Sequence, residues 1–182
     1  MPKRHIKKGG TLTYALEVDS PFTGIFLAEL SDTGPDQTVS DPGEESLFAH
    51  DKNRQYNNLG AATLKLNQQS KTATIVVKKN VRWSDGKPVT AKDVEYAYEI
   101  LANSKVNTTM YNSNLEDLKG VSEYHHGKTN KISGIELPDG PNGKKVVLHF
   151  KEMVPAMLEV GNSYIWNYAA PYHYLKMFRL IN

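Results

Sequence analysis

The 182-residue sequence contains no cysteine. Disulfide bridges, thiolate metal sites and a cysteine nucleophile are therefore excluded, whereas the cellular compartment is left open. The sequence also lacks an apolar run close to the ~20 residues that a membrane-spanning helix needs. Its charged first residues are not followed by the apolar segment of a signal peptide. These absences describe a soluble protein, or one from which a leader has been trimmed.

The sequence also lacks a large excess of either positive or negative charge. The sequence has 22 lysine and arginine residues against 20 aspartate and glutamate residues, for a net charge of +2. Nucleic-acid binding needs clustered basic side chains, and the one such cluster lies at residues 2–8. Because this cluster has no apolar anchor, we predict a disordered start over residues 1–9. We expect no nucleic-acid partner.

The apolar residues that are present follow two different periods. Alternation with period 2 predicts a strand over residues 9–18, a hairpin over residues 61–80 and a strand over residues 144–150. Period 3.6 predicts a helix after Thr90. Residues 31–46 are rich in proline, glycine, aspartate and serine, which predicts a long surface loop. The change of period along the chain indicates an α+β fold.

The stretch VRWSDGKPVTAKDVEYAYEIL, residues 81–101, carries the strongest local signals. Gly86 can take a positive φ at the end of a Ser-Asp-Gly turn. Thr90, with Asp93 three residues later, is a variant of the capping box and predicts the start of a helix. We interpret the turn, the proline and the cap as structural, because no nucleophile stands beside a base in this stretch.

His125 and His126 are the candidates for metal binding or hydrolysis. Adjacent side chains point in different directions, and the H-E-x-x-H spacing that places two ligands on one helix face is absent. We favour an exposed turn before Gly127, and we expect no catalytic residue, no metal site and no cofactor. The alternatives are a hydrolase or metal-binding protein that uses these histidines, or an inactive structural protein.

The stretch at residues 81–101 also strongly resembles the signature of the extracytoplasmic solute-binding proteins of peptide ABC importers, the oligopeptide-binding family. That signature is a strand ending in Trp or Phe, then S-D-G-x-P-[VL]-T-A-x-D-V and a helix, and every element is present. Further blocks resemble the family in the same order: GGTLTYAL at residues 9–16, ESLFAHD at residues 45–51, KKVVLHFKEMVPAML at residues 144–158 and YAAPYHYLK at residues 168–176. The version here is similar to members from lactic-acid bacteria and related Gram-positive organisms.

The resemblance implies the N-terminal portion of a two-lobed periplasmic-binding-protein type II fold. This portion is mainly the small family-specific lobe, with mixed or antiparallel strands and short helices. Residues 10–30 would give the first strand of the large lobe and the following loop, residues 31–170 the small lobe, and residues 171–182 a return toward the large lobe. Family members are much longer and carry a lipoprotein signal with a lipid-bearing cysteine. We therefore interpret the chain as truncated, and its last residues, MFRLIN, resemble nothing in the family.

The resemblance also implies a function. The family supplies the substrate-binding component of an ABC importer, which binds oligopeptides through main-chain hydrogen bonds and delivers them to a membrane permease. Other members bind nickel, haem, sugars or a peptide pheromone, and the sequence does not choose among these ligands. The implied location is extracytoplasmic, anchored at the cell surface. A chain that holds one wall of the cleft should bind its ligand poorly, and unpaired strand edges favour self-association.

The implied peptide contacts rest on loop placement by resemblance. They lie in the loop after the first strand and in a loop at residues 110–112. One further contact comes from the run at residues 164–175, which is rich in aromatic residues. We expect the other aromatic side chains of this run to pack in a core. The implied ligand-binding residues are Asp19, Ser20, Pro21, Phe22, Thr23, Tyr111, Asn112 and Trp166.

Overall fold

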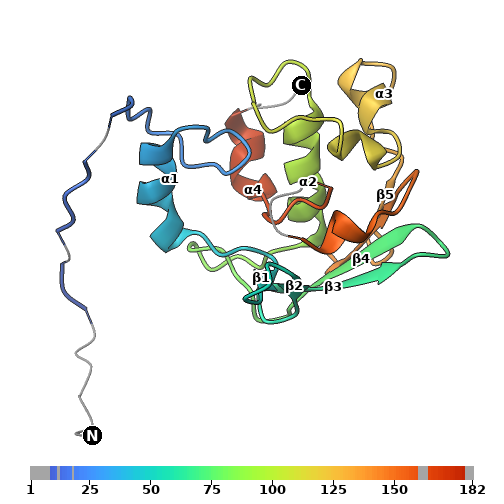
Figure 1. The fold of residues 1–182 in the computed structure, drawn as a ribbon, viewed down its shortest axis with the longest axis horizontal. Coiled ribbons are helices and arrows are strands. Elements are labelled where there is room, and N and C mark those ends of the chain that lie inside the picture. The colour runs from blue at the N-terminus through green and yellow to red at the C-terminus, as the bar shows by residue number, and fades with distance from the viewer. Residues whose placement is uncertain (1–8, 12, 18, 160–163, 179–182) are drawn as a thin grey trace, which may run out of the picture.

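The fold combines short helices with antiparallel strands (Figure 1). The computed structural model describes residues 9–11, 13–17, 19–159 and 164–178. Its α-helices are α1 (Gly34–Ser40), α2 (Ala91–Ala102), α3 (Val121–His125) and α4 (Tyr172–Leu175). Its strands are β1 (Ala49–His50), β2 (Tyr56–Asn57), β3 (Ala62–Asn67), β4 (Thr72–Val77), β5 (Ile135–Glu136) and β6 (Lys145–His149). Short 3₁₀ helices occupy Asp41–Gly43, Leu115–Asp117, Pro155–Leu158 and Lys176–Phe178. The α+β prediction is confirmed.

Four of the strands form one antiparallel sheet in the order β3-β4-β6-β5, while β1 and β2 pair separately. The β3–β4 hairpin is the one predicted from the sequence, and it sets Leu64 opposite Ile75. Ile75 in turn lies opposite Val146 on β6. Since alternate side chains of a strand share a face, these residues line one apolar face with Leu148. Ile75, Val146 and Leu148 are fully buried.

Helix α2 packs on this apolar face and closes the core. Its stripe of Val94, Tyr98 and Leu101 belongs to the same buried cluster as the sheet residues. Each such side chain contributes about 1.5–3 kcal/mol when it is taken fully out of water. The helix starts where the sequence predicts it, because Thr90 and Asp93 form a capping box. None of the helices in the described part of the chain has the length and apolar character to cross a membrane.

The described residues of the range 9–18 do not form the predicted strand. None of the described residues between 9 and 17 is assigned to a strand, and this segment runs away from the rest of the chain (Figure 1). A strand needs a neighbour for its backbone N–H and C=O groups, and no described strand pairs with this segment. Leu12, Val18 and residues 1–8 of the predicted disordered start lie outside the described residues.

The long surface loop predicted over residues 31–46 is also wrong. It contains α1 and the 3₁₀ helix Asp41–Gly43. Thr33 is the N-cap of α1, with its hydroxyl accepting a hydrogen bond from the N–H of Asp36, and Pro35 stands in the first turn. A proline in that position starts a helix rather than breaking one, because the N–H it lacks has no partner there. Residues typical of loops therefore begin a helix here.

Candidate functional site

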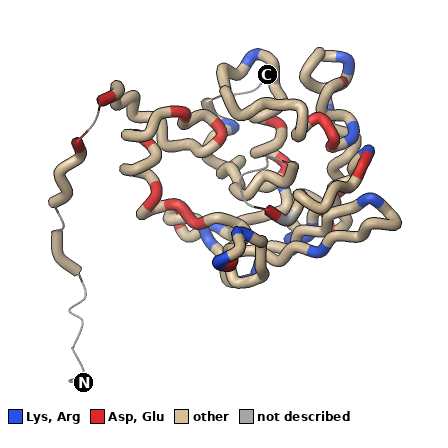
Figure 2. The backbone as a smooth tube through the Cα atoms, viewed as in Figure 1, with Lys and Arg blue, Asp and Glu red and all other residues tan. Residues whose placement is uncertain are grey.

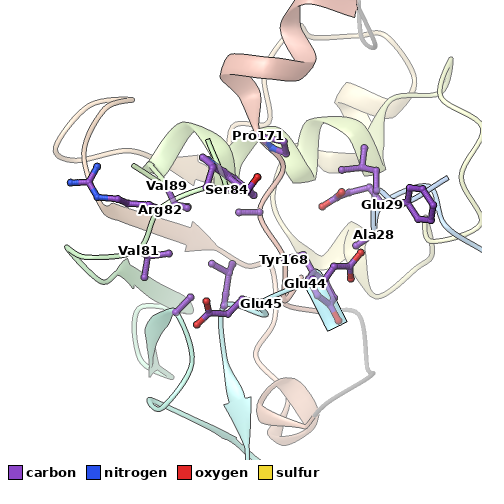
Figure 3. A pocket seen from close by; sticks show the side chains of 17 residues that line it. Ala28, Glu29, Glu44, Glu45, Val81, Arg82, Ser84, Val89, Tyr168 and Pro171 are labelled. Atoms are coloured by element: carbon purple, nitrogen blue, oxygen red, sulfur yellow. The ribbon is translucent and has the colours of Figure 1, made fainter. Parts of the chain in front are cut away.

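A cavity of about 450 Å³ lies where four segments of the chain meet (Figure 3). The segments are residues 26–29, 43–47, 81–89 and 168–171, and Ala61 adds to the lining. The size falls within the range of small-ligand pockets, which are mostly apolar with a few placed polar groups. The apolar lining includes Phe26, Leu47, Val81, Trp83, Val89 and Pro171. Segments from both ends of the described chain therefore build one concave surface.

Asp36 on α1 holds the loop that leads into the first wall, residues 26–29. The Asp36 carboxylate accepts hydrogen bonds from the backbone N–H of Thr23 at 3.1 Å, from its hydroxyl at 2.5 Å and from the N–H of Gly24 at 2.8 Å. The Thr33 hydroxyl donates to the same group at 2.5 Å. Burial acts to raise the pKa of the Asp36 carboxyl, but these hydrogen bonds hold it below its ordinary value. The loop at residues 23–24 is thus tied to the first turn of α1.

Glu29 is the polar group that this wall buries. Its side chain is 0% exposed, and Oε1 accepts a hydrogen bond from the indole Nε1–H of Trp166 at 2.8 Å. The Thr108 hydroxyl donates to the Glu29 backbone carbonyl at 2.6 Å. The second carboxyl oxygen, Oε2, is buried without a hydrogen-bond partner. Burial raises the pKa of the Glu29 carboxyl to about 7, because the charged form loses its hydration.

The surroundings of Glu29 are acidic, since acidic residues gather in the segment that follows α1 (Figure 2). Glu44 and Glu45 line the same cavity, and the Glu44 charge adds to the burial that raises the pKa of Glu29. Burial first, and then the nearby carboxylates of Glu44, Asp41 and Glu29, raise the pKa of the Tyr168 phenol. The cavity therefore has a negative end, and the guanidinium of Arg82, the basic residue of its lining, is turned away from it (Figure 3).

The last wall, residues 168–171, is held by Asp93 at the start of α2. Asp93 is 2% exposed. Its Oδ2 accepts the N–H of Thr90 at 2.7 Å and the indole N–H of Trp83 at 3.3 Å. Its Oδ1 accepts the N–H of Tyr172 at 2.9 Å. The predicted turn is present too, since Gly86 has φ +83°. The sequence motif therefore caps a helix, and it also anchors a distant segment that the sequence did not connect to it.

The residues predicted to contact a peptide fall into two groups. Asp19, Pro21, Phe22 and Thr23 are exposed in the loop that leads to the cavity, and Ser20 beside them is partly exposed. Phe22 is 54% exposed, and its ring centroid lies 5.9 Å from that of Phe26, which lines the cavity.

The second group comprises Tyr111, Asn112 and Trp166, which are partly buried. The Tyr111 hydroxyl donates to Glu116 at 2.8 Å. Asn112 accepts the N–H of Asn114 at 3.0 Å. Trp166 lines a second cavity of about 220 Å³ together with Met110, the neighbour of Tyr111. The structure thus brings Trp166 close to the loop at residues 110–112, and it leaves Tyr111 and Asn112 outside the lining of the larger cavity.

Of the histidine pair, His126 lies in an exposed turn before Gly127, as expected from the sequence, whereas His125 does not. His125 ends α3, is partly buried and stacks on Tyr111 with ring centroids 3.9 Å apart. Its Nδ1 lies 3.0 Å from the carbonyl oxygen of Ala102, and Nδ1 of His126 lies 2.7 Å from that of Ser122. Among the described residues, no three His, Asp or Glu side chains form a group that could hold a metal ion. His125 therefore packs α3 against neighbouring segments, whereas His126 bonds back to its own helix.

Sequence reasoning missed Glu29, Glu44 and Tyr168 as site residues. The one signal for Glu29 is its position as the lone carboxylate in the apolar run IFLAEL, residues 25–30. Lys, Glu, Arg and Asp are almost never fully buried unless they have a partner. A single glutamate in such a run therefore marks a candidate for a buried acid.

Comparison with known proteins identifies the family of this chain. The profile of the family described as "Bacterial extracellular solute-binding proteins, family 5 Middle" matches residues 55–177. The chain is 44% identical over 160 residues to the oligopeptide-binding protein OppA of Lactococcus lactis subsp. cremoris (strain SK11). That match covers 87% of this chain and 27% of the lactococcal protein. A shorter match to OppA of Bacillus subtilis (strain 168) has 34% identity over 68 residues and covers 37% of this chain and 12% of that protein.

The solved structures that share the fold include two OppA proteins. Lactococcal OppA complexed with an endogenous peptide in the closed conformation matches with a TM-score of 0.84 and 43% identity, over 87% of this chain and 30% of that one. Haemophilus influenzae OppA in complex with the peptide RPPGFSPFR matches with a TM-score of 0.59 and 26% identity, over 71% of this chain and 25% of that one.

These matches define the class of protein. The fold is that of part of a type II periplasmic binding protein, as the resemblance implied. The chain belongs to the bacterial extracellular solute-binding proteins of family 5, because the family profile covers more than half of its residues. It spans 27% of the length of the lactococcal relative.

Proposed function

We propose that this chain forms one wall of a receptor that binds oligopeptides for an ABC importer. The observation that carries the proposal is the match to lactococcal OppA, with a TM-score of 0.84 over 87% of the chain, since that protein was solved with a peptide bound. The described segments around the cavity give the proposed wall its concave surface. The binding role follows from the wall and from the family, and it involves no bond-breaking chemistry.

For each residue proposed to contact the peptide, the proposed role follows from its exposure and from the hydrogen bonds that its side chain already makes within the chain. The loop at residues 19–23 offers exposed backbone, which an extended peptide can meet with main-chain hydrogen bonds. Trp166 and Tyr111 already donate their polar hydrogens to Glu29 and Glu116. Their proposed contribution is therefore the face of each ring. Asn112 is engaged with the backbone of residues 110 and 114, so its proposed role is to fix the shape of the loop that presents Tyr111.

The wider role is part of the same proposal. The receptor would act outside the cytoplasm, at the cell surface, and deliver peptides to a membrane permease. We keep residues 10–30 as part of a large lobe, residues 31–170 as the small lobe and residues 171–182 as a return to the large lobe. Strands β3 and β5 are the outer strands of the sheet. Because outer strands present unpaired backbone groups, we propose that the chain by itself self-associates.

Isothermal titration calorimetry with a mixed oligopeptide library tests the binding role. A cleft that closes on its ligand from two sides buries most of the ligand surface. The chain alone should therefore bind peptides about a thousandfold more weakly than lactococcal OppA, a difference of about 4 kcal/mol. Affinity equal to that of lactococcal OppA would contradict the reasoning about a single wall.

A chimera tests the peptide function independently of that weakness. The 160-residue block of lactococcal OppA that matches this chain is replaced by the sequence of this chain. Peptide affinity within about tenfold of lactococcal OppA supports the proposal, and Trp166→Ala in the chimera should weaken binding. A chimera that unfolds cooperatively but binds no peptide refutes the proposed function. The control is Leu59→Ala, because Leu59 is 83% exposed and lines neither of the two cavities.

A further inference from the structure

The segment at residues 9–17 exposes apolar side chains that no described strand covers. Tyr14 is 73% exposed, and Leu16, two positions later, is partly exposed. The described residues of this segment belong to no helix or strand, and the segment runs away from the rest of the chain (Figure 1). Since alternate residues of an extended chain share a face, Tyr14 and Leu16 can enter one apolar surface together. Removal of these side chains from water is favourable.

The point where this segment joins the fold is fixed. Asp36 accepts hydrogen bonds from the N–H of Thr23 at 3.1 Å and from the N–H of Gly24 at 2.8 Å. The segment leaves this point in the direction away from the cavity of its own chain (Figure 1). It would have to reverse that direction to reach its own cavity, whereas a cavity on a second copy requires no reversal. The partner that fits is therefore another copy of the chain.

The cavity of about 450 Å³ offers apolar surface that an entering chain can reach. Phe26 in its lining is exposed, and Val81 and Trp83 in its lining are partly exposed. The exposed ring of Phe22 lies 5.9 Å from that of Phe26 and extends this surface beyond the cavity. A volume of this size is typical of pockets that hold a small ligand. It therefore has room for side chains of an entering segment.

The charges of the segment and of the cavity are opposite. Glu44 and Glu45 line the cavity, and Glu45 is exposed. The sequence that precedes the segment, PKRHIKK at residues 2–8, is basic and contains no carboxylate. The carboxylate of the segment itself, Glu17, lies at its opposite end. Complementary charges of this kind orient two partners and speed their association.

We propose that residues 9–17 of one copy dock in the 450 Å³ cavity of a second copy, with Tyr14 and Leu16 against its apolar lining. The positive charge of residues 2–8 complements that of Glu44 and Glu45. The exchange is reciprocal, which gives a closed two-fold dimer. This inference rests on the self-association proposed above and names a surface for it that the outer strands do not share. Because the docked segment fills the cavity, the dimer excludes a peptide from it.

Sedimentation velocity of the full chain tests the dimer without any variant. Two short segments bury less surface than a standard interface, so we expect a dissociation constant of about 1–100 µM. Tyr14→Ser should weaken the dimer at least about tenfold, because it removes the large apolar group that docks. Glu45→Lys should weaken it at least about fivefold. Glu123→Lys changes the net charge equally on the exposed side of α3 and should leave the dissociation constant unchanged.

Two outcomes of this experiment overturn the proposal. One is a chain that stays monomeric up to about 100 µM. The other is a dimer whose dissociation constant is unchanged in Tyr14→Ser or in Glu45→Lys. Neither outcome bears on the proposed peptide binding, which the chimera with lactococcal OppA tests separately.

Cross-linking locates the docked segment. The chain has no cysteine of its own, so Ala15→Cys is introduced in one preparation and Ser84→Cys, in the cavity lining, in another. After mixing with a short bis-maleimide, a link between the two cysteines must join different copies. Docking raises the effective concentration of one thiol near the other, so Ser84→Cys should give at least about tenfold more of this product than Glu123→Cys. Equal yields from a chain that dimerises would assign the dimer to another surface and overturn the inference, while the proposed self-association would stand.

Discussion

Replacing Asp93 by alanine should strongly destabilise this protein, because the buried Asp93 carboxylate holds two separate segments. Asp93 accepts the N–H of Thr90 at 2.7 Å and the N–H of Tyr172 at 2.9 Å, and it lies 3.3 Å from the indole nitrogen of Trp83. Its removal opens the capping box of α2 and releases the segment that follows residue 168. One substitution therefore loosens both the helix and the last wall of the cavity.

The magnitude follows from the groups that lose their partner. Loss of an N-cap interaction costs about 1 kcal/mol. A hydrogen bond to a charged acceptor contributes about 1.5–3 kcal/mol, and the lower value applies to Tyr172 because it is partly exposed and water can reach it. Together with the weaker contact to Trp83, the expected loss is about 3 kcal/mol. Asp93→Asn keeps an acceptor but loses the charge, so it should cost about half of that.

Urea denaturation followed by circular dichroism measures the effect. With a slope of about 2 kcal/mol per molar urea, a loss of about 3 kcal/mol lowers the midpoint by about 1.5 M. Asp139→Ala is the matched control, because Asp139 is exposed and such surface changes stay within about 0.5 kcal/mol. If the midpoints of Asp93→Ala and Asp139→Ala coincide, the assignment of Asp93 as the anchor of both segments is wrong.

Three further predictions concern the acid, a glycine and the core. Burial raises the pKa of Glu29 to about 7, so the folded state binds a proton more tightly than the unfolded state. The free energy of unfolding should therefore fall by up to about 3 kcal/mol between about pH 4.5 and about pH 7. Glu29→Gln should flatten this part of a stability-against-pH curve, and an unchanged slope contradicts the assignment. Gly120→Ala should cost about 2–4 kcal/mol in urea denaturation, because φ is +83° and a Cβ would lie 2.4 Å from the backbone nitrogen of Ser133. Gly127→Ala, with φ +68° and open space around it, should cost only about 1 kcal/mol, and equal losses would exclude the steric reason. Leu148→Ala removes a fully buried side chain from the centre of the sheet and should lower the free energy of unfolding by about 2–5 kcal/mol, whereas a loss below about 1 kcal/mol would place Leu148 outside the core.

The sequence predicted the elements whose signals are local. The β3–β4 hairpin, β6, the turn at Gly86 and the start of α2 each follow from alternation, from a glycine or from a capping pair within a few residues. The same short stretch at residues 81–101 carried the family resemblance that the comparisons confirmed. The two wrong predictions both concern segments whose structure depends on more than the type of residue they contain. The strand over residues 9–18 needed a partner, and the loop over residues 31–46 hid a cap at Thr33 behind residues typical of turns.

The candidate site, in contrast, depends on contacts between residues that are far apart in the sequence. Whether Glu29 is an exposed carboxylate or a buried acid depends on Trp166, which lies 137 positions later in the chain. Asp93 likewise accepts hydrogen bonds from the N–H groups of Ala170 and Tyr172, which lie in a segment far from its helix in the sequence. By itself, the sequence determined the periodicity, the capping box at Thr90 and Asp93 and the family, because these are properties of neighbouring residues. Only the tertiary structure decided which carboxyl group loses its water and which oxygen lacks a partner, because burial is set by distant segments that meet in space.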